Sequence, residues 1–345
     1  MFTRGIHTNK RRKRPKIVHA VLLLVLVVLG WSQSGGQEVL RYEASADCMG
    51  GVFTVTAYGS NRIQLEAAVT ESLEEARRLD SLLSNYKAAS EWSKVNREAG
   101  RTPVAVSKEL FELLEACLQY SRESEGTFDI SVGPLMRRWG FFKGSGRYPH
   151  RSEIRTAMAA VGYKNIILDR RTQTVRFRNP LTEMDPGGIG KGYAVDRMVA
   201  ILRESGITSA FITAAGSSMY GLGTPPREAG WKVVIRHPAD RERNVAEVLL
   251  KDEAMATSGS LEKYFMAGGN IYSHIMDPRS GYPAQGTLSV SLIGPNAIDT
   301  EAWAKPLYIL GRDWAARHKP KGMRVFHCPE GPKGQRWETT CEWLQ

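Results

Sequence analysis

Cysteine is scarce in this chain, which has four among 345 residues, at positions 48, 117, 328 and 341. Cysteines so few and so widely spaced exclude a disulfide-rich scaffold and a cysteine-ligated metal site. An internal repeat is also missing, and no proline- and serine-rich linker follows residue 50. We therefore expect one compact unit of two lobes rather than a repeat array or tethered domains.

Acidic residues are absent from the first 36 positions, which carry seven of the Lys and Arg residues. Removing their +7 from the net charge of +11 leaves +4 for the remaining residues. That remainder has no long Lys/Arg run and no basic helix pattern, so nucleic acid is not an expected partner. Hydrophobic residues make up 42% of the chain, which is enough for a sizeable globular core.

The amino-terminal segment has the three parts of a secretory signal. Basic residues precede a mostly apolar stretch at 17–31, and small polar residues follow at 32–36. The apolar stretch is shorter than the roughly 20 residues of a membrane span. Residues 1–36 are therefore predicted to be a signal peptide, with an uncleaved membrane anchor as the alternative. In both cases we expect an exported body, in the periplasm or at the outer face of the inner membrane.

Two of the cysteines fall in a predicted carboxy-terminal hairpin. Its strands are expected at 323–327 and 337–344, with a Gly/Pro turn between them. Outside the cytoplasm Cys328 and Cys341 could pair across this hairpin. Two free thiols are the alternative, and the sequence leaves both open.

Hydrophobic periodicity predicts helices packed on short strands. Apolar residues recur at helical spacing through 65–83, 110–120 and 195–202, and Ser107 and Ser152 are expected to cap helices. Pro306 is expected to kink a later helix or to delay its start. Strands are predicted at 52–57, 166–168, 175–177, 211–213, 233–235 and 245–250. These elements indicate an α+β chain with mostly antiparallel strands.

The most informative segment is Asp-Pro-Gly-Gly-Ile-Gly-Lys-Gly-Tyr-Ala-Val-Asp at 185–196. Its four glycines let the backbone approach a ligand closely, and the helix that follows offers unpaired N–H groups to an anion. With Lys191 it predicts a phosphate cradle. The cradle is not a P-loop, because Gly192 replaces Ser or Thr, and it is not a dinucleotide fingerprint, because Tyr193 replaces the third glycine. A glycine-rich turn without a ligand is the alternative.

A second polar constellation lies downstream, in Thr-Ser-Gly at 257–259 and in Tyr-Ser-His-Ile-Met-Asp-Pro-Arg-Ser-Gly-Tyr-Pro at 272–283. Together with 185–196 it resembles the ApbE family, the flavin transferases that move FMN from FAD onto a protein Thr or Ser. Upstream motifs that also resemble this family stand at 49–51, 83–86, 90–96 and 126–135. The resemblance extends from about residue 47 to about residue 312.

The resemblance implies a single α+β catalytic unit over 47–345. Its expected architecture is two-lobed and T-fold-like, with mostly antiparallel sheets flanked by helices. It also implies an FAD pocket, in which the cradle meets the diphosphate and aromatic side chains supply planar apolar surface. The residues that it places around FAD are Met49, Tyr86, Thr127, Phe128, Asp129, Asp185, Gly187, Gly188, Lys191 and Leu288.

The resemblance also implies catalytic roles. His274 is the candidate base or orienting group, Asp277 would fix it or bind the flavin, and Lys191 would meet the phosphates. The acceptor would be a flavoprotein such as a membrane redox subunit or a flavin-dependent reductase, and the amino-terminal segment could add a membrane contact. The alternatives are an FAD pyrophosphatase that releases FMN and AMP, and a non-catalytic periplasmic protein that binds FAD.

The family uses a divalent cation, usually Mg²⁺, and here the sequence departs from the family pattern. Glu301 stands at the position of a ligating Asp and Lys305 at that of a ligating Thr. Glu can bind a hard cation through oxygen, whereas an ammonium cannot and could take the place of the cation. Glu301 and Gly188 are the candidate metal positions. Segment 214–218 also lacks polar side chains that the family usually has, so the metal requirement stays open.

Overall fold

The structure is a computed structural model that describes residues 38–144, 146–332 and 337–345. The predicted signal peptide or anchor at 1–36 lies outside the described residues. Residues Glu38–Gln345 form one compact unit. Within the described ranges no helix combines the length and the apolar character needed to cross a bilayer.

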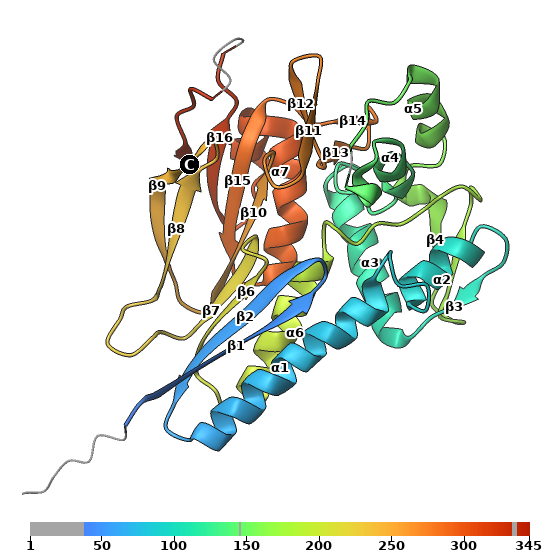
Figure 1. Cartoon of the computed structure of the whole chain (residues 1–345). Helices are drawn as coiled ribbons and strands as arrows, with labels where there is room; N and C mark the ends of the chain where they lie inside the picture. The colour runs from blue at the N-terminus through green and yellow to red at the C-terminus, as the bar shows by residue number, and fades with distance from the viewer. Residues whose placement is uncertain (1–37, 145, 333–336) are drawn as a thin grey trace, which may run out of the picture. The chain divides into compact units, whose positions relative to one another are not determined.

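An eight-stranded sheet forms the larger lobe of this unit (Figure 1). Every pair of neighbouring strands in it is antiparallel, which confirms the predicted strand direction. In spatial order the strands are β1 (Leu40–Cys48), β2 (Gly51–Gly59), β6 (Ser209–Ala214), β7 (Ser218–Leu222), β10 (Glu253–Gly259), β15 (Thr287–Gly294), β16 (Arg324–Pro329) and β17 (Glu342–Leu344).

Both faces of the sheet are covered around strand β15, which is buried along its whole length. One face packs against three helices, α1 (Arg62–Leu83), α6 (Gly190–Glu204) and α7 (Ala297–His318). The other face packs against the hairpin of β8 (Trp231–His237) and β9 (Asp240–Leu250). Burial on both sides explains why β15 contains no charged residue, since its apolar residues alternate only with Thr and Ser.

The smaller lobe comes from the chain between α1 and α6, and it lies beside the end of α1 in Figure 1. Its core contains Trp92, Leu114, Phe128 and Met184. Its elements are α2 (Glu91–Glu98), β3 (Val104–Ala105), α3 (Lys108–Glu123), α4 (Gly133–Arg138), α5 (Arg151–Met158), β4 (Ile166–Asp169) and β5 (Thr174–Phe177), with short 3₁₀ turns at Phe141–Lys143 and Tyr163–Asn165.

Two short hairpins connect the lobes. They are formed by β11 (Tyr264–Ala267) with β12 (Asn270–Ser273), and by β13 (Met276–Asp277) with β14 (Tyr282–Pro283). Trp139 of the smaller lobe donates from Nε1 to the carbonyl of Gly281 at 2.9 Å. Its ring also lies 5.4 Å from that of Tyr272. These contacts hold the His274 segment between the two lobes.

One of the two predicted helix caps is confirmed. Ser107 Oγ accepts from the N–H of Leu110, at the start of α3. The prediction for Ser152 is wrong, because His150 caps α5 and its ring accepts from the N–H of Ser152. The carboxylate of Glu153 accepts from the N–H of His150 in return. A capping box of this kind is not obvious from sequence when the cap is His rather than Ser or Thr.

Of the two effects expected from Pro306, the delayed start of α7 is wrong. The helix begins at Ala297, well before the proline, and continues through it. The non-helical backbone inside α7 is at Gly311, where φ is 76°. Glycine adopts this conformation without the clash that a Cβ would cause, so the interruption falls there rather than at the proline.

The carboxy-terminal hairpin is present, with β16 paired to β17 so that Val325 opposes Leu344. Cys328 and Cys341 form a disulfide across it. Of the two alternatives that the sequence left open, the structure has the bonded pair. Cys48 and Cys117 are free and buried.

Candidate active site

Asp185 folds the glycine-rich segment into a turn before α6. Its backbone N–H donates to the carbonyl of Ile130 at 2.7 Å. Its carboxylate accepts from the N–H of Gly187 at 2.7 Å and from Asn85 Nδ2 at 3.2 Å. Burial raises the pKa of this carboxyl. These bonds lie within the smaller lobe, and the turn leads directly into α6, which packs on the large sheet, so the cradle lies where the two lobes meet.

The glycines of the cradle serve different purposes. A Cβ on Gly192 would lie 2.4 Å from the carbonyl oxygen of Ala297, so this glycine permits close packing of α6 on α7. A Cβ on Gly188 would stand 3.4 Å from the ring of Phe128, at a pocket wall. The expectation that the glycines as a group serve a ligand is therefore corrected, since Gly187 and Gly188 line the pocket and Gly192 packs two helices.

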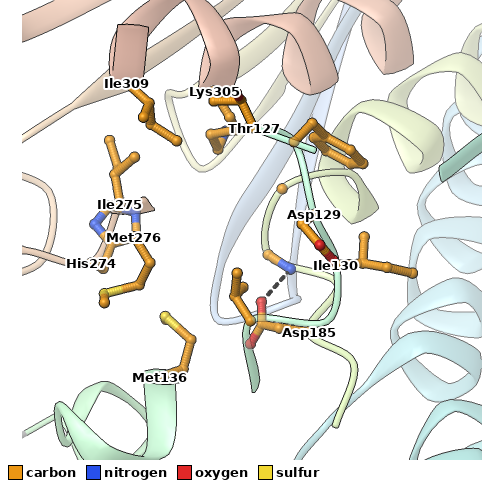
Figure 2. A pocket seen from close by; sticks show the side chains of 14 residues that line it. Thr127, Asp129, Ile130, Met136, Asp185, His274, Ile275, Met276, Lys305 and Ile309 are labelled. Carbon is orange, nitrogen blue, oxygen red and sulfur yellow. Dashed lines mark hydrogen bonds between the residues drawn. The ribbon is translucent and has the colours of Figure 1, made fainter. Parts of the chain in front are cut away.

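A largely apolar pocket, here called the apolar pocket, opens over Gly187 and Gly188 (Figure 2). Figure 2 shows Asp129 and Ile130 on one side of it, Ile309 and Lys305 projecting from α7, and Met276 on the opposite side. Its walls thus combine the smaller lobe, α7 and the segment after β12. Its lining includes Thr127, Phe128, Asp129, Met136, Asp185 and His274.

Asp129 anchors the loop that carries Thr127 and Phe128. Its carboxylate accepts from the N–H groups of Ser131 at 2.7 Å and Tyr163 at 2.6 Å. Burial raises the pKa of Asp129 to about 6, although these hydrogen bonds favour the ionised form. The carboxyl is therefore mostly ionised at neutral pH and holds the pocket wall in place.

A second pocket, here called the polar pocket, lies on the other side of Lys305. It is lined by Lys191, Ser217, Ser218, Thr257, Ser258 and Glu301, among others. Gly187, His274 and Lys305 line both pockets, so the two pockets adjoin at these residues. Tertiary packing brings these groups together, because they come from α6, the β6–β7 turn, β10 and α7. The family resemblance placed Lys305 at a ligating position, and the packing of α7 brings it to both pockets.

Hydrogen bonds fix several groups of the polar pocket. Lys191 Nζ donates to Ser217 Oγ, and the carboxylate of Glu301 accepts from the N–H of Gly192 in the first turn of α6. Glu301 is only 2% exposed. Ser258 Oγ is buried and has no hydrogen-bond partner in the described structure. A ligand oxygen would satisfy this hydroxyl.

His274 is placed to act as a neutral imidazole. Its Nδ1 lies 3.2 Å from the carbonyl of Lys263 and must donate to it, because a carbonyl only accepts. Nε2 is therefore the ring atom that accepts a proton. Burial, followed by the charge of Lys305, lowers the pKa of His274 from 6.5 to about 3.

Four of the predicted site residues are not among those that line the two pockets. Leu288 packs on the β8–β9 face of the sheet, away from the helices. Asp277 is held by Arg279, whose backbone N–H, Nε and Nη2 all donate to its carboxylate. Met49 packs against the hydrophobic cores of both lobes. Tyr86 is exposed, with its ring edge towards Phe142. Their roles toward FAD stay predictions.

The side chains present do not fit a divalent cation. Across the described ranges, no group of three or more His, Cys, Asp or Glu side chains is placed to hold a metal ion. Of the two expected metal positions, Glu301 lines the polar pocket but accepts a backbone N–H, and Gly188 lines the apolar pocket. Lys305 lines the apolar pocket together with Gly188 and the polar pocket together with Glu301.

Sequence reasoning missed several side chains that line the site. Met136, Ile275 and Ile309 form apolar wall, and Ser217 with Ser218 line the polar pocket. For Ser217 and Ser218 a signal existed, because they stand in segment 214–218, where the family usually has polar residues. The apolar residues carried no signal, since nothing distinguishes a pocket wall from a core in sequence.

Comparisons of sequence and of structure both find members of the ApbE family. The sequence model of the ApbE family matches residues 49–326. The chain is 31% identical over 272 residues to an FAD:protein FMN transferase of Klebsiella pneumoniae, covering 78% of this chain and 83% of the relative. It is 29% identical over 287 residues to one of Salmonella typhimurium, covering 81% of each. The solved ApbE protein of Thermotoga maritima is 29% identical, with a TM-score of 0.80 over 88% of this chain and 96% of that one.

Proposed function

The chain belongs to the ApbE family, and we propose that it transfers FMN from FAD to a Thr or Ser hydroxyl of an acceptor flavoprotein, with release of AMP. The observation that carries this proposal is that the apolar and polar pockets adjoin, with Gly187, His274 and Lys305 lining both. A flavin dinucleotide has matching parts, because a flat ring system is joined through a ribityl chain to a diphosphate. The apolar pocket suits the ring and the polar pocket suits the phosphates.

The chemistry is a displacement at phosphorus. The acceptor hydroxyl oxygen attacks the phosphorus of the FMN half, and a new P–O bond forms while the P–O bond to the AMP half breaks. AMP leaves with the electron pair of that bond, and the hydroxyl proton passes to a base. Lys191 neutralises charge on the phosphate oxygens during this step.

His274 is the proposed base. Its neutral imidazole presents Nε2 as acceptor, because Nδ1 donates to the carbonyl of Lys263. A pKa of about 3 makes it a weak base in the protein alone, partly through the charges of Lys305 and Lys191. A bound diphosphate would offset those charges and raise the pKa, so the base would gain strength when substrate is present.

The acceptor and the compartment follow from the same proposal. The acceptor is a flavoprotein with an accessible Thr or Ser, such as a membrane redox subunit or a flavin-dependent reductase. The body lies outside the cytoplasm, in the periplasm or at the outer face of the inner membrane, and residues 1–36 export or anchor it. The Cys328–Cys341 disulfide supports this location, because disulfides persist in oxidising compartments.

One incubation tests the proposed function. The purified protein is mixed with FAD, with and without a flavoprotein acceptor, in parallel with and without Mg²⁺. Covalent flavin fluorescence on the acceptor, with AMP released in equal amount, supports the transferase. Release of FMN and AMP without acceptor identifies a pyrophosphatase instead, and a retained yellow ligand without AMP identifies a binding protein.

A further inference from the structure

Helix α7 carries an acid and a base on one face at the polar pocket. Glu301 and Lys305 are four residues apart, which places them one helical turn from each other. Both line the polar pocket, and Lys305 also lines the apolar pocket. In Figure 2 the Lys305 side chain comes from α7 at the opposite side of the pocket from Asp185. Lys305 therefore stands at the junction where the diphosphate is proposed to lie.

The carboxylate of Glu301 is committed to the protein itself. It accepts from the N–H of Gly192, one of the donors in the first turn of α6 that would otherwise lack a helical partner. A second oxygen ligand at the Lys305 position is lacking, because that side chain ends in an ammonium. The other acid of the polar pocket, Glu262, is exposed. These acids do not make a cage for a small divalent cation.

The positive charge of Lys305 and Lys191 where the two pockets adjoin also argues against a bound divalent cation. Burial lowers the pKa of the Lys305 ammonium, and the nearby Lys191 lowers it further, whereas Glu301 acts in the opposite direction. A divalent cation would add two positive charges close to two ammonium groups, and like charges repel strongly in a site with little water. A diphosphate would instead be attracted by both lysines and could accept from the unpartnered, 3% exposed hydroxyl of Ser258.

From this arrangement we propose that the Lys305 ammonium replaces the divalent cation, so that this chain binds FAD and transfers FMN without a metal ion. The inference depends on the proposed function, because it assigns the diphosphate of FAD to the polar pocket. Lys305 supplies a positive charge to the phosphates from a fixed position on α7. Glu301 keeps a structural role, tying α7 to the first turn of α6.

The first test uses the full-length protein without any substitution. Metal is removed with EDTA, and FAD binding is measured by calorimetry with EDTA and with millimolar Mg²⁺. We expect dissociation constants that agree within roughly threefold, and FMN transfer rates that agree as closely. An affinity at least tenfold higher with Mg²⁺ overturns the inference and leaves the proposed function intact. No binding of FAD under either condition overturns the proposed function, and the inference with it.

A second test exchanges the charge on α7. In Lys305→Thr we expect FAD affinity in EDTA to fall roughly tenfold or more. The double variant Glu301→Asp/Lys305→Thr should recover affinity when Mg²⁺ is added, and it should bind Mn²⁺ in an EPR titration, whereas the parent should not. Lys251→Thr, which removes an exposed lysine in the β9–β10 turn, is the matched control and should behave as the parent. Tight Mn²⁺ binding by the parent, or unchanged FAD affinity in Lys305→Thr with its fold intact, overturns the inference.

Discussion

Lys191 gives the cradle its charge, and at the scale of single residues it is the most direct test of the site. Its ammonium is held in the polar pocket by Ser217 Oγ. In Lys191→Met the side chain keeps most of its length and loses its charge, so stabilisation of the phosphate oxygens is lost. We expect the rate of FMN transfer, measured as kcat/KM for FAD, to fall roughly 100-fold or more.

The control for this substitution is Lys251→Met, an exposed lysine outside both pockets. It should leave kcat/KM unchanged. Far-UV circular dichroism and the melting temperature of both variants report whether the fold is retained. A correctly folded Lys191→Met protein that transfers FMN at the rate of the parent would remove Lys191 from the site.

His274 makes a prediction about pH. Its pKa is lowered from 6.5 to about 3 in the folded protein. Between these values the unfolded chain binds the proton and the folded protein does not, so this group makes the free energy of unfolding decrease as pH falls from about 6.5 towards 3. In His274→Gln that loss is absent, and stability should fall less between pH 7 and pH 5 than in the parent.

Urea unfolding at both pH values measures this difference. Asp129 and Asp196 have pKa values raised to about 6, and they contribute stability in the opposite sense as the pH falls. They are present in both proteins, so comparing the parent with His274→Gln isolates the histidine. An identical pH dependence in the two proteins would show that His274 is protonated in the folded state like an exposed imidazole.

At the scale of elements, the packing of α6 on α7 determines the geometry of the polar pocket, because Lys191 lies on one helix and Lys305 on the other. A Cβ on Gly192 would lie 2.4 Å from the carbonyl oxygen of Ala297, which cannot move without shifting α7. We expect Gly192→Ala to lower the free energy of unfolding by about 1–3 kcal/mol, the usual cost of overpacking. Chemical denaturation measures it.

Gly190→Ala is the matched control, because it adds the same methyl group two residues earlier in the same helix. The added Cβ would meet no atom closer than 3.8 Å, the distance to the Pro186 Cβ, which is ordinary contact. Its stability should therefore equal or exceed that of the parent, since Ala favours a helix more than Gly does. Equal destabilisation of the two variants would contradict the assignment of Gly192 to helix packing.

At the scale of the whole molecule, the site exists because two lobes and α7 meet at the cradle. The apolar pocket takes Phe128 from the smaller lobe, Ile275 from the segment that connects the lobes, and Lys305 from the helix on the sheet. A ligand that binds there contacts all three. Its binding should therefore stabilise the molecule as a whole rather than one loop.

This arrangement predicts linked stabilisation by FAD. At an FAD concentration 100-fold above its dissociation constant, the free energy of unfolding should rise by about 2.7 kcal/mol, because only the folded protein binds. Hydrogen exchange should slow in residues 127–131 and in α7 together. Protection confined to one of these two segments would place FAD elsewhere.

The fold follows in large part from local patterns. The 195–202 spacing predicted α6, and the alternation at 211–213 lies within β6. Cap and break positions were less well predicted, as His150 and Gly311 show. These depend on which competing local bond or backbone conformation the surrounding structure favours, and local sequence alone does not fix that choice.

By itself the sequence determined the chemistry available, namely a glycine cradle with Lys191, an aromatic and acidic loop at 127–129, and a histidine at 274, and the structure brings these residues to one site. Only the tertiary structure decided how other residues are used. Leu288 belongs to the face of the sheet that is packed against β8 and β9, and Asp277 is paired with Arg279. It also decided that Lys305 stands between the two pockets. Such outcomes depend on which element packs on which face, and contacts between residues distant in the chain set that packing.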